Sequence, residues 1–208
     1  ERVIQYLEQI ALKHDLEKGH TVGMLTAAKM ENVAIRTMDY KELAVTAIVT
    51  GGVDVNGGRV GDPASYYELD GTYHFFTGTV NIILLVQGFL PPYALVRSII
   101  TATEAKTAAL QELMAPSCYS TGIATGSGTD QIVVVADPKS PYTFTDAGKH
   151  SKLGELIGIT VKEAVKEALD KETSLNPVTQ RNFLARWARY GIGLQDFWEE
   201  AKAWGYQG

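Results

Sequence analysis

A short run of β-branched residues, Ile132 to Val135, constrains the fold most, because a glycine-rich loop precedes it and a long helical pattern follows. The loop is Ala124-Thr125-Gly126-Ser127-Gly128-Thr129-Asp130. A short apolar run bounded by turn residues is typical of a buried strand. Residues 152–171 carry apolar side chains at the spacing of a helix with one buried face. This unit predicts an α/β arrangement with candidate site residues on its loops.

Further strands and helices are predicted on both sides of this unit. Residues 33–38 and 43–49 alternate in polarity across a short turn, which predicts an antiparallel pair. From Thr50 to Gly71 glycines and Pro63 predict a loop of about 20 residues, a length that is often functional. The other expected elements are a strand at 21–26, two strands within 72–87 (the second at 80–86), and helices at 1–17, 94–114 and, in two pieces, after residue 174.

The predicted fold class is α/β, with α+β as the alternative. Strands in succession followed by a strand–helix unit predict a mixed, partly antiparallel sheet packed by helices. We expect one domain over residues 1–173 and a C-terminal helical extension, rich in aromatic residues, over 174–208. The extension is predicted to contact a second copy of the chain or to cover the core.

Composition narrows the function classes. The net charge of −5, without a basic block, argues against nucleic acid or an anionic membrane as a partner. No apolar run approaches the ~20 residues needed to span a membrane. A single cysteine, Cys118, excludes an internal disulfide and fits a reducing, cytoplasmic location. The chain opens on Glu1 instead of methionine, so sequence preceding it is expected.

The glycine-rich loop at 124–130 is the first candidate binding site. Its glycines let backbone N–H groups approach an anion or a carbonyl oxygen, and Thr125, Ser127 and Thr129 add hydroxyl groups. It does not match a dinucleotide fingerprint, because it precedes its strand and lacks the third glycine. The alternative is a turn without a binding role.

A second polar cluster, Gly148-Lys149-His150-Ser151, precedes the long helix. It differs from a phosphate loop because Thr143 replaces the first glycine and His150 replaces the magnesium-binding hydroxyl, so we reject ATP hydrolysis. A helix N-terminus disfavours a proton on His150, which would suit it to act as a general base. The alternative is a capping or surface histidine.

Two polar side chains lie within apolar patterns. Lys106 falls within ~20° of Leu95 and Leu113 on a helical projection, whereas Glu104 lies on the opposite side. Lys106 therefore either reaches past the core edge or points into a site. Asn81 lies in the strongest predicted strand and must find hydrogen-bond partners there, in neighbouring loops or in a ligand.

Metal binding has weak support. The sequence contains no His-x3-His or His-Glu-x2-His spacing, so no metal site is predicted. Asp54, Asp62 and Asp70 punctuate the long loop, where turns are favoured over metal ligation. No cofactor is predicted with certainty, and the requirement for a metal stays open.

Six motifs, in order over residues 20–170, resemble the adenosylcobinamide amidohydrolases of corrinoid salvage. The resemblance implies hydrolysis of the amide joining aminopropanol to the corrin ring, so the corrinoid is the substrate and adenosylcobyric acid the product. Family members have additional sequence before the region matched by residues 1–20, which implies a fragment or missing strands. The family pattern Ser-Asn-Ala after Val53 is replaced here by Asp54-Val55-Asn56. The motifs are residues 22–28, 49–53, 78–83, 101–109, 124–130 and 148–158.

On that resemblance, polar loops would form the substrate pocket. The predicted substrate-binding residues are Thr50, Gly51, Thr79, Asn81, Thr125, Ser127, Thr129 and Lys149, and the predicted catalytic residues are His150, Lys106, Asp130 and Glu104. His150 or Asp130 would activate water, and Lys106 or Lys149 would stabilise the oxyanion. A threonine nucleophile, Thr50 or Thr125, is the alternative mechanism. Alternative functions are a non-catalytic corrinoid-binding module and a structural subunit.

Overall fold

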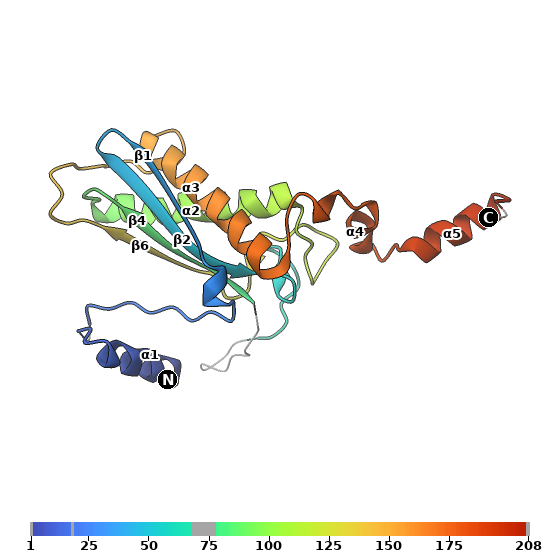
Figure 1. The fold of residues 1–208 in the computed structure, drawn as a ribbon, viewed down its shortest axis with the longest axis horizontal. Helices are drawn as coiled ribbons and strands as arrows, with labels where there is room; N and C mark the ends of the chain where they lie inside the picture. The colour runs from blue at the N-terminus through green and yellow to red at the C-terminus, as the bar shows by residue number, and fades with distance from the viewer. Residues whose placement is uncertain (1, 18, 68–77, 207–208) are drawn as a thin grey trace.

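A computed structural model describes residues 2–17, 19–67 and 78–206, and it places helices on one face of a mixed sheet (Figure 1). The sheet has the strand order β1-β2-β4-β6. Its strands are β1 (Ala34–Tyr40), β2 (Leu43–Gly52), β4 (Thr79–Val86) and β6 (Gln131–Ala136). The covering helices are α2 (Pro92–Leu113) and α3 (Lys152–Thr173).

The strand directions follow from the connections. β1 and β2 form an antiparallel hairpin, and Lys41 in its turn adopts a φ of 53°. β4 pairs antiparallel with β2, from Gly52↔Thr79 to Val45↔Val86. β6 pairs parallel with β4 because helix α2 returns the chain to the same edge before β6 begins. This arrangement confirms the predicted mixed, partly antiparallel sheet.

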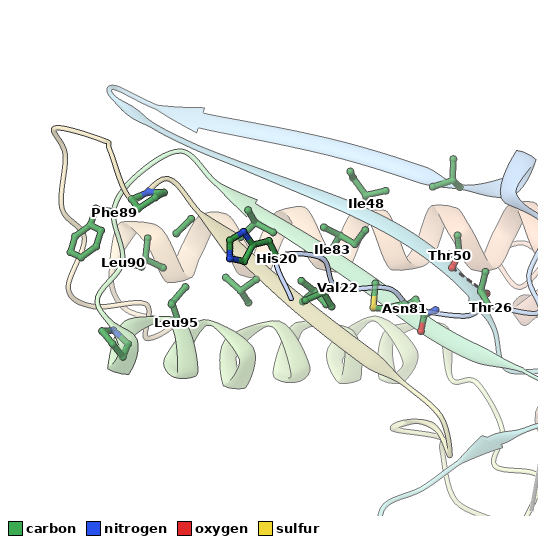
Figure 2. Close-up of a pocket in the computed structure, with 18 of the residues that line it drawn as sticks. His20, Val22, Thr26, Ile48, Thr50, Asn81, Ile83, Phe89, Leu90 and Leu95 are labelled. Carbon is green, nitrogen blue, oxygen red and sulfur yellow. Dashed lines mark hydrogen bonds between the residues drawn. The ribbon is translucent and has the colours of Figure 1, made fainter. Parts of the chain in front are cut away.

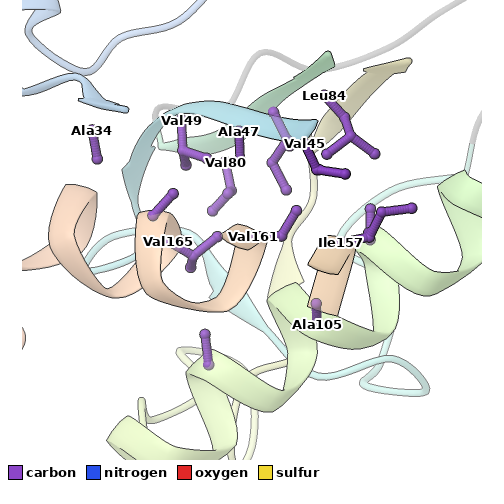
Figure 3. Packing of buried hydrophobic residues seen from close by; sticks show 14 of the residues in the cluster. Ala34, Val45, Ala47, Val49, Val80, Leu84, Ala105, Ile157, Val161 and Val165 are labelled. Atoms are coloured by element: carbon purple, nitrogen blue, oxygen red, sulfur yellow. The ribbon is translucent and has the colours of Figure 1, made fainter. Parts of the chain in front are cut away.

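Alternating residues of β2 face opposite sides of the sheet. Val45, Ala47 and Val49 are buried against α3, and Val80 and Leu84 of β4 join the same core (Figure 3). The intervening Thr46, Ile48 and Thr50 point to the other side, which we call the open face because α2 and α3 do not cover it. The core therefore lies between the sheet and these two helices.

The remaining elements lie around this body. Helix α1 (Arg2–Lys13) and the short helix η1 (Met30–Asn32) flank the segment 19–29, and β3 (Gly57–Gly58) pairs with β5 (Gly126–Ser127). After η2 (Thr179–Arg181), helices α4 (Phe183–Ala188) and α5 (Leu194–Ala203) extend away from the sheet (Figure 1). In the part of the chain that the structure describes, no helix is long and apolar enough to cross a membrane.

One predicted strand is wrong. Residues 21–26 form no strand, and the Asn81 side chain, not a sheet ladder, binds the Leu25 carbonyl at 2.6 Å. The first strand predicted within 72–87 falls largely on residues 68–77, outside the described residues. The Asn176 side chain accepts from the N–H groups of Val178 and Thr179 ahead of η2, and Asn182 caps the later helix α4. The division at residue 173 and the contact between copies through the tail stay predictions.

Glu112 connects α2 to α3 and gives the fold an acid-sensitive contact. Its carboxylate accepts from Lys162 at 2.9 Å and pairs with Lys166. Hydrogen bonds from Lys166 and then Lys162 hold the pKa of Glu112 below its usual 4.5. A pKa that is lower in the folded state stabilises the fold above the unfolded-state pKa, and this contribution is lost as the pH falls through the folded-state pKa.

We therefore expect the free energy of unfolding to decrease on acidification below about pH 4.5, and Glu112→Gln to weaken that dependence. Urea unfolding of both proteins from about pH 3 to about pH 6 measures it. Equal pH dependence in the two proteins would contradict this assignment. Because the pair is half exposed, the loss at neutral pH is expected to be below about 1 kcal/mol.

Candidate active site

A buried ion pair joins helix α2 to the glycine-rich loop at 124–130. Lys106 of α2 contacts the Asp130 carboxylate at the end of the glycine-rich loop, and their side chains are only 8% and 12% exposed. Lys106 therefore does not reach past the core edge, because its ammonium group turns inward to an acidic partner. Thr79 joins this group through a 2.7 Å hydrogen bond to the Thr129 carbonyl.

Asp130 is held by several donors in addition to Lys106. Its Oδ1 accepts from the N–H of Val80 at 2.9 Å and from the hydroxyl of Ser127 at 2.6 Å. The N–H of Ser127 lies 3.0 Å from both carboxylate oxygens. A carboxylate has about four acceptor positions, and these contacts fill them. Asp130 is therefore well placed to orient Lys106 and Ser127.

Lys106 of this pair borders a cavity of about 800 Å³. The cavity contains three of the predicted substrate-binding residues, Thr125, Ser127 and Thr129, together with Lys106. No hydrogen bond among the described residues uses the N–H of Gly128, so this donor is available to a ligand. The remaining lining residues include Asn56, Gly58, Arg59, Val60, Asp62, Pro63, Ala64, Thr103, Thr107 and Tyr119.

Sequence reasoning missed Asn56 and Tyr119 as cavity residues. Asn56 is 2% exposed, donates to the Gly78 carbonyl at 3.1 Å and accepts from the Tyr119 hydroxyl at 2.9 Å. An asparagine directly before Gly57-Gly58 in the long loop was an available signal. The sequence around Tyr119 gave no such signal. Tyr119 lies near Asn56 because the Cys118 N–H donates to the Gly57 carbonyl, a contact between segments distant in sequence.

Asp62 forms a turn, as predicted. It accepts from the Arg59 N–H at 2.8 Å and from the Ser117 hydroxyl at 2.6 Å. The hydroxyls of Ser117 and Ser120 and the Arg59 N–H hold the pKa of Asp62 below its usual 3.8. Among the described residues, no group of three or more His, Cys, Asp or Glu side chains could hold a metal ion. Asp70 lies outside these residues.

Thr50 and Asn81 lie in a different cavity, of about 920 Å³, on the open face of the sheet (Figure 2). They are paired neighbours on β2 and β4, and both are buried. Thr50 contacts the Thr26 hydroxyl at 3.3 Å. Gly51 points the other way, toward Leu169 and Val80. The predicted substrate-binding residues are therefore distributed over two cavities, with Thr50 and Asn81 in one and Thr125, Ser127 and Thr129 in the other.

Glu104, Lys149 and His150 form a third location. Lys149 pairs with Glu104 at 3.0 Å, and both side chains are at least half exposed. His150 is exposed in the turn before α3 and lines neither of the two cavities. The structure does not bring these three residues to the Lys106–Asp130 pair, and their catalytic or substrate-binding roles stay predictions.

The fold and the cavity together describe an α/β protein with a buried lysine–aspartate pair beside a cavity of about 800 Å³. The chain matches the adenosylcobinamide amidohydrolase family over residues 1–177 and belongs to it. It is 40% identical to an uncharacterized protein of Methanocaldococcus jannaschii, over 82% of this chain and 71% of the relative. A Methanosarcina mazei protein named adenosylcobinamide amidohydrolase is 30% identical over 80% of this chain and 74% of its own length. No solved structure matches the chain.

Proposed function

We propose that this protein hydrolyses the aminopropanol amide of adenosylcobinamide and releases adenosylcobyric acid for cobamide synthesis. The observation that carries the proposal is the buried Lys106–Asp130 pair at a cavity with hydroxyl and backbone donors. Family membership and the name of the Methanosarcina relative supply the substrate. Hydrolysis of an unactivated amide requires an oxyanion donor, a proton acceptor and an acid for the leaving amine.

Lys106 is the proposed oxyanion donor. One of its three N–H groups is directed to Asp130, which leaves the others for the cavity. A charged donor that is largely removed from water stabilises a developing oxyanion more strongly than an exposed donor does. The N–H of Gly128, which bonds to none of the described residues, is the proposed second donor.

Ser127 is the proposed proton relay for the attacking water. Its hydroxyl lines the cavity and donates to Asp130 Oδ1 at 2.6 Å, so Asp130 can accept a proton through a hydrogen bond it already makes. Water attacks the amide carbon and its proton passes through Ser127 to Asp130. The same proton then goes to the leaving nitrogen as the C–N bond breaks, giving a carboxylic acid and aminopropanol.

Incubation of the protein with adenosylcobinamide, followed by mass spectrometry, tests the proposal. We expect aminopropanol and adenosylcobyric acid in equal amounts, and a parallel incubation with chelator determines whether a metal is required. Intact substrate after long incubation, despite measurable binding, would support the alternative of a corrinoid-binding module.

A second experiment separates the two candidate proton acceptors. The cavity geometry predicts that Ser127→Ala lowers kcat by about 10²-fold, a magnitude typical of lost acid–base groups. The sequence-based alternative predicts a loss of that size for His150→Ala. Near-wild-type turnover in Ser127→Ala together with a large loss in His150→Ala would overturn the relay.

A further inference from the structure

The cavity on the open face of the sheet has no part in the mechanism above. Its floor is formed by Ile48, Ile83 and Val133, which lie side by side on β2, β4 and β6. Val22 (Figure 2) and Met24, both from the segment before η1, also line it. With about 920 Å³, it is larger than the cavity beside Lys106.

The chemistry of the lining selects the ligand class. No Asp, Glu, Lys or Arg lines this cavity among the described residues, and its His20 already contacts Glu17 at 3.0 Å, so the lining does not favour a phosphate or a charged peptide. A broad apolar floor with an adaptable methionine suits a large, flat, mostly apolar ligand. Three of the polar side chains, Thr26, Thr50 and Asn81, lie together at one end, whereas His20 lies away from that end (Figure 2).

That polar end adjoins the Lys106–Asp130 pair through three consecutive residues of β4. Asn81 faces the open-face cavity, and its Oδ1 lies 3.3 Å from the Thr79 hydroxyl. Thr79 holds the Thr129 carbonyl, and the N–H of Val80 binds Asp130. A ligand on the open face would therefore have its polar edge near the strand end that positions the catalytic pair.

We propose that the open-face cavity binds the corrin macrocycle, while the side arm with the scissile amide extends past Asn81 toward Lys106. This inference rests on the proposed function, because it assigns the two parts of that substrate to two cavities. The apolar floor covers one face of the ring. Thr26, Thr50 and Asn81 meet the amide groups at its edge.

Ile83→Asp tests the docking site, with Ile35→Asp as the matched control. Ile83 lines the cavity, whereas Ile35 is 58% exposed on the same face of the sheet, on β1 outside the cavity. A buried carboxylate beneath the ring should raise KM for adenosylcobinamide and Kd for cobinamide by at least about tenfold. We expect kcat to stay within about threefold, and Ile35→Asp to leave both constants unchanged.

The outcomes separate this inference from the proposed function. Loss of cobinamide binding in Ile83→Asp, in a protein that releases no aminopropanol, would support the docking site and overturn the hydrolysis. Normal KM and Kd in a folded Ile83→Asp variant would overturn the docking site alone. If Ile83→Asp changed the sedimentation of the protein and left corrinoid binding unchanged, a second copy of the chain would cover this face. That result would also overturn the docking site. Val133→Thr, a milder change, serves if Ile83→Asp does not fold.

Discussion

Replacing Lys106 by methionine is expected to lower kcat by about 10²–10³-fold, because the variant loses the charged donor for the oxyanion. The side chain keeps nearly the same length, so the packing of α2 changes little. The substitution also leaves Asp130 largely buried without its counter-charge. Breaking a buried pair from one side typically costs about 3–5 kcal/mol of unfolding free energy. Steady-state kinetics and urea unfolding measure the two effects separately.

The double variant Lys106→Met/Asp130→Asn distinguishes catalysis from stability. An asparagine at position 130 removes the unpaired charge, so part of the lost unfolding free energy should return. The kcat should stay low, because the charged donor and the proton acceptor are both absent. Recovery of turnover together with stability would show that both residues act only through the fold, and would overturn the assignments of Lys106 as oxyanion donor and of Asp130 as proton acceptor.

Helical and strand periodicity predicted the framework of this site. The position of Lys106 between Leu95 and Leu113 on the helical projection predicted a buried face, and α2 has it there. The run from Ile132 to Val135 became the centre of β6, which extends one residue further at each end. Both predictions depend on local spacing, which packing of the sheet against helices preserves. Residues 21–26 show the limit, because a short strand-like segment can also be an extended segment that forms no ladder with the sheet.

Partners that are distant in sequence could not be predicted in this way. Asn56 and Tyr119 are brought together by the β3–β5 region and the loop after α2, which no periodicity encodes.

His150 illustrates the same limit. It precedes the N-terminal end of α3, whereas Gly51 and Gly52, at the strand end near Thr79, pack against Leu169 and Glu172 at the C-terminal end. Order along the chain suggested a shared site, and the direction of α3 separates the two regions.

Gly126→Ala is expected to disrupt the ion pair without removing either charge. A Cβ at position 126 would overlap Asp130 Oδ2 and lie 2.6 Å from Lys106 Nζ. Because Asp130 is held by Val80 and Ser127, it cannot move away freely, and Lys106 must leave its position. Displacing a buried charge from its partner should lower the unfolding free energy by about 2–4 kcal/mol and kcat by about 10²-fold.

Gly158→Ala is the matched control for this substitution. Gly158 lies within α3, and an added Cβ meets no atom within 4 Å. Alanine there should raise the unfolding free energy by about 0.5–1 kcal/mol, because it lowers the backbone entropy of the unfolded chain, and kcat should not change. Wild-type kcat and stability in Gly126→Ala would mean that the Lys106–Asp130 contact tolerates the displacement that an added Cβ causes. The close fit of the glycine-rich loop around the pair would then have no role in catalysis.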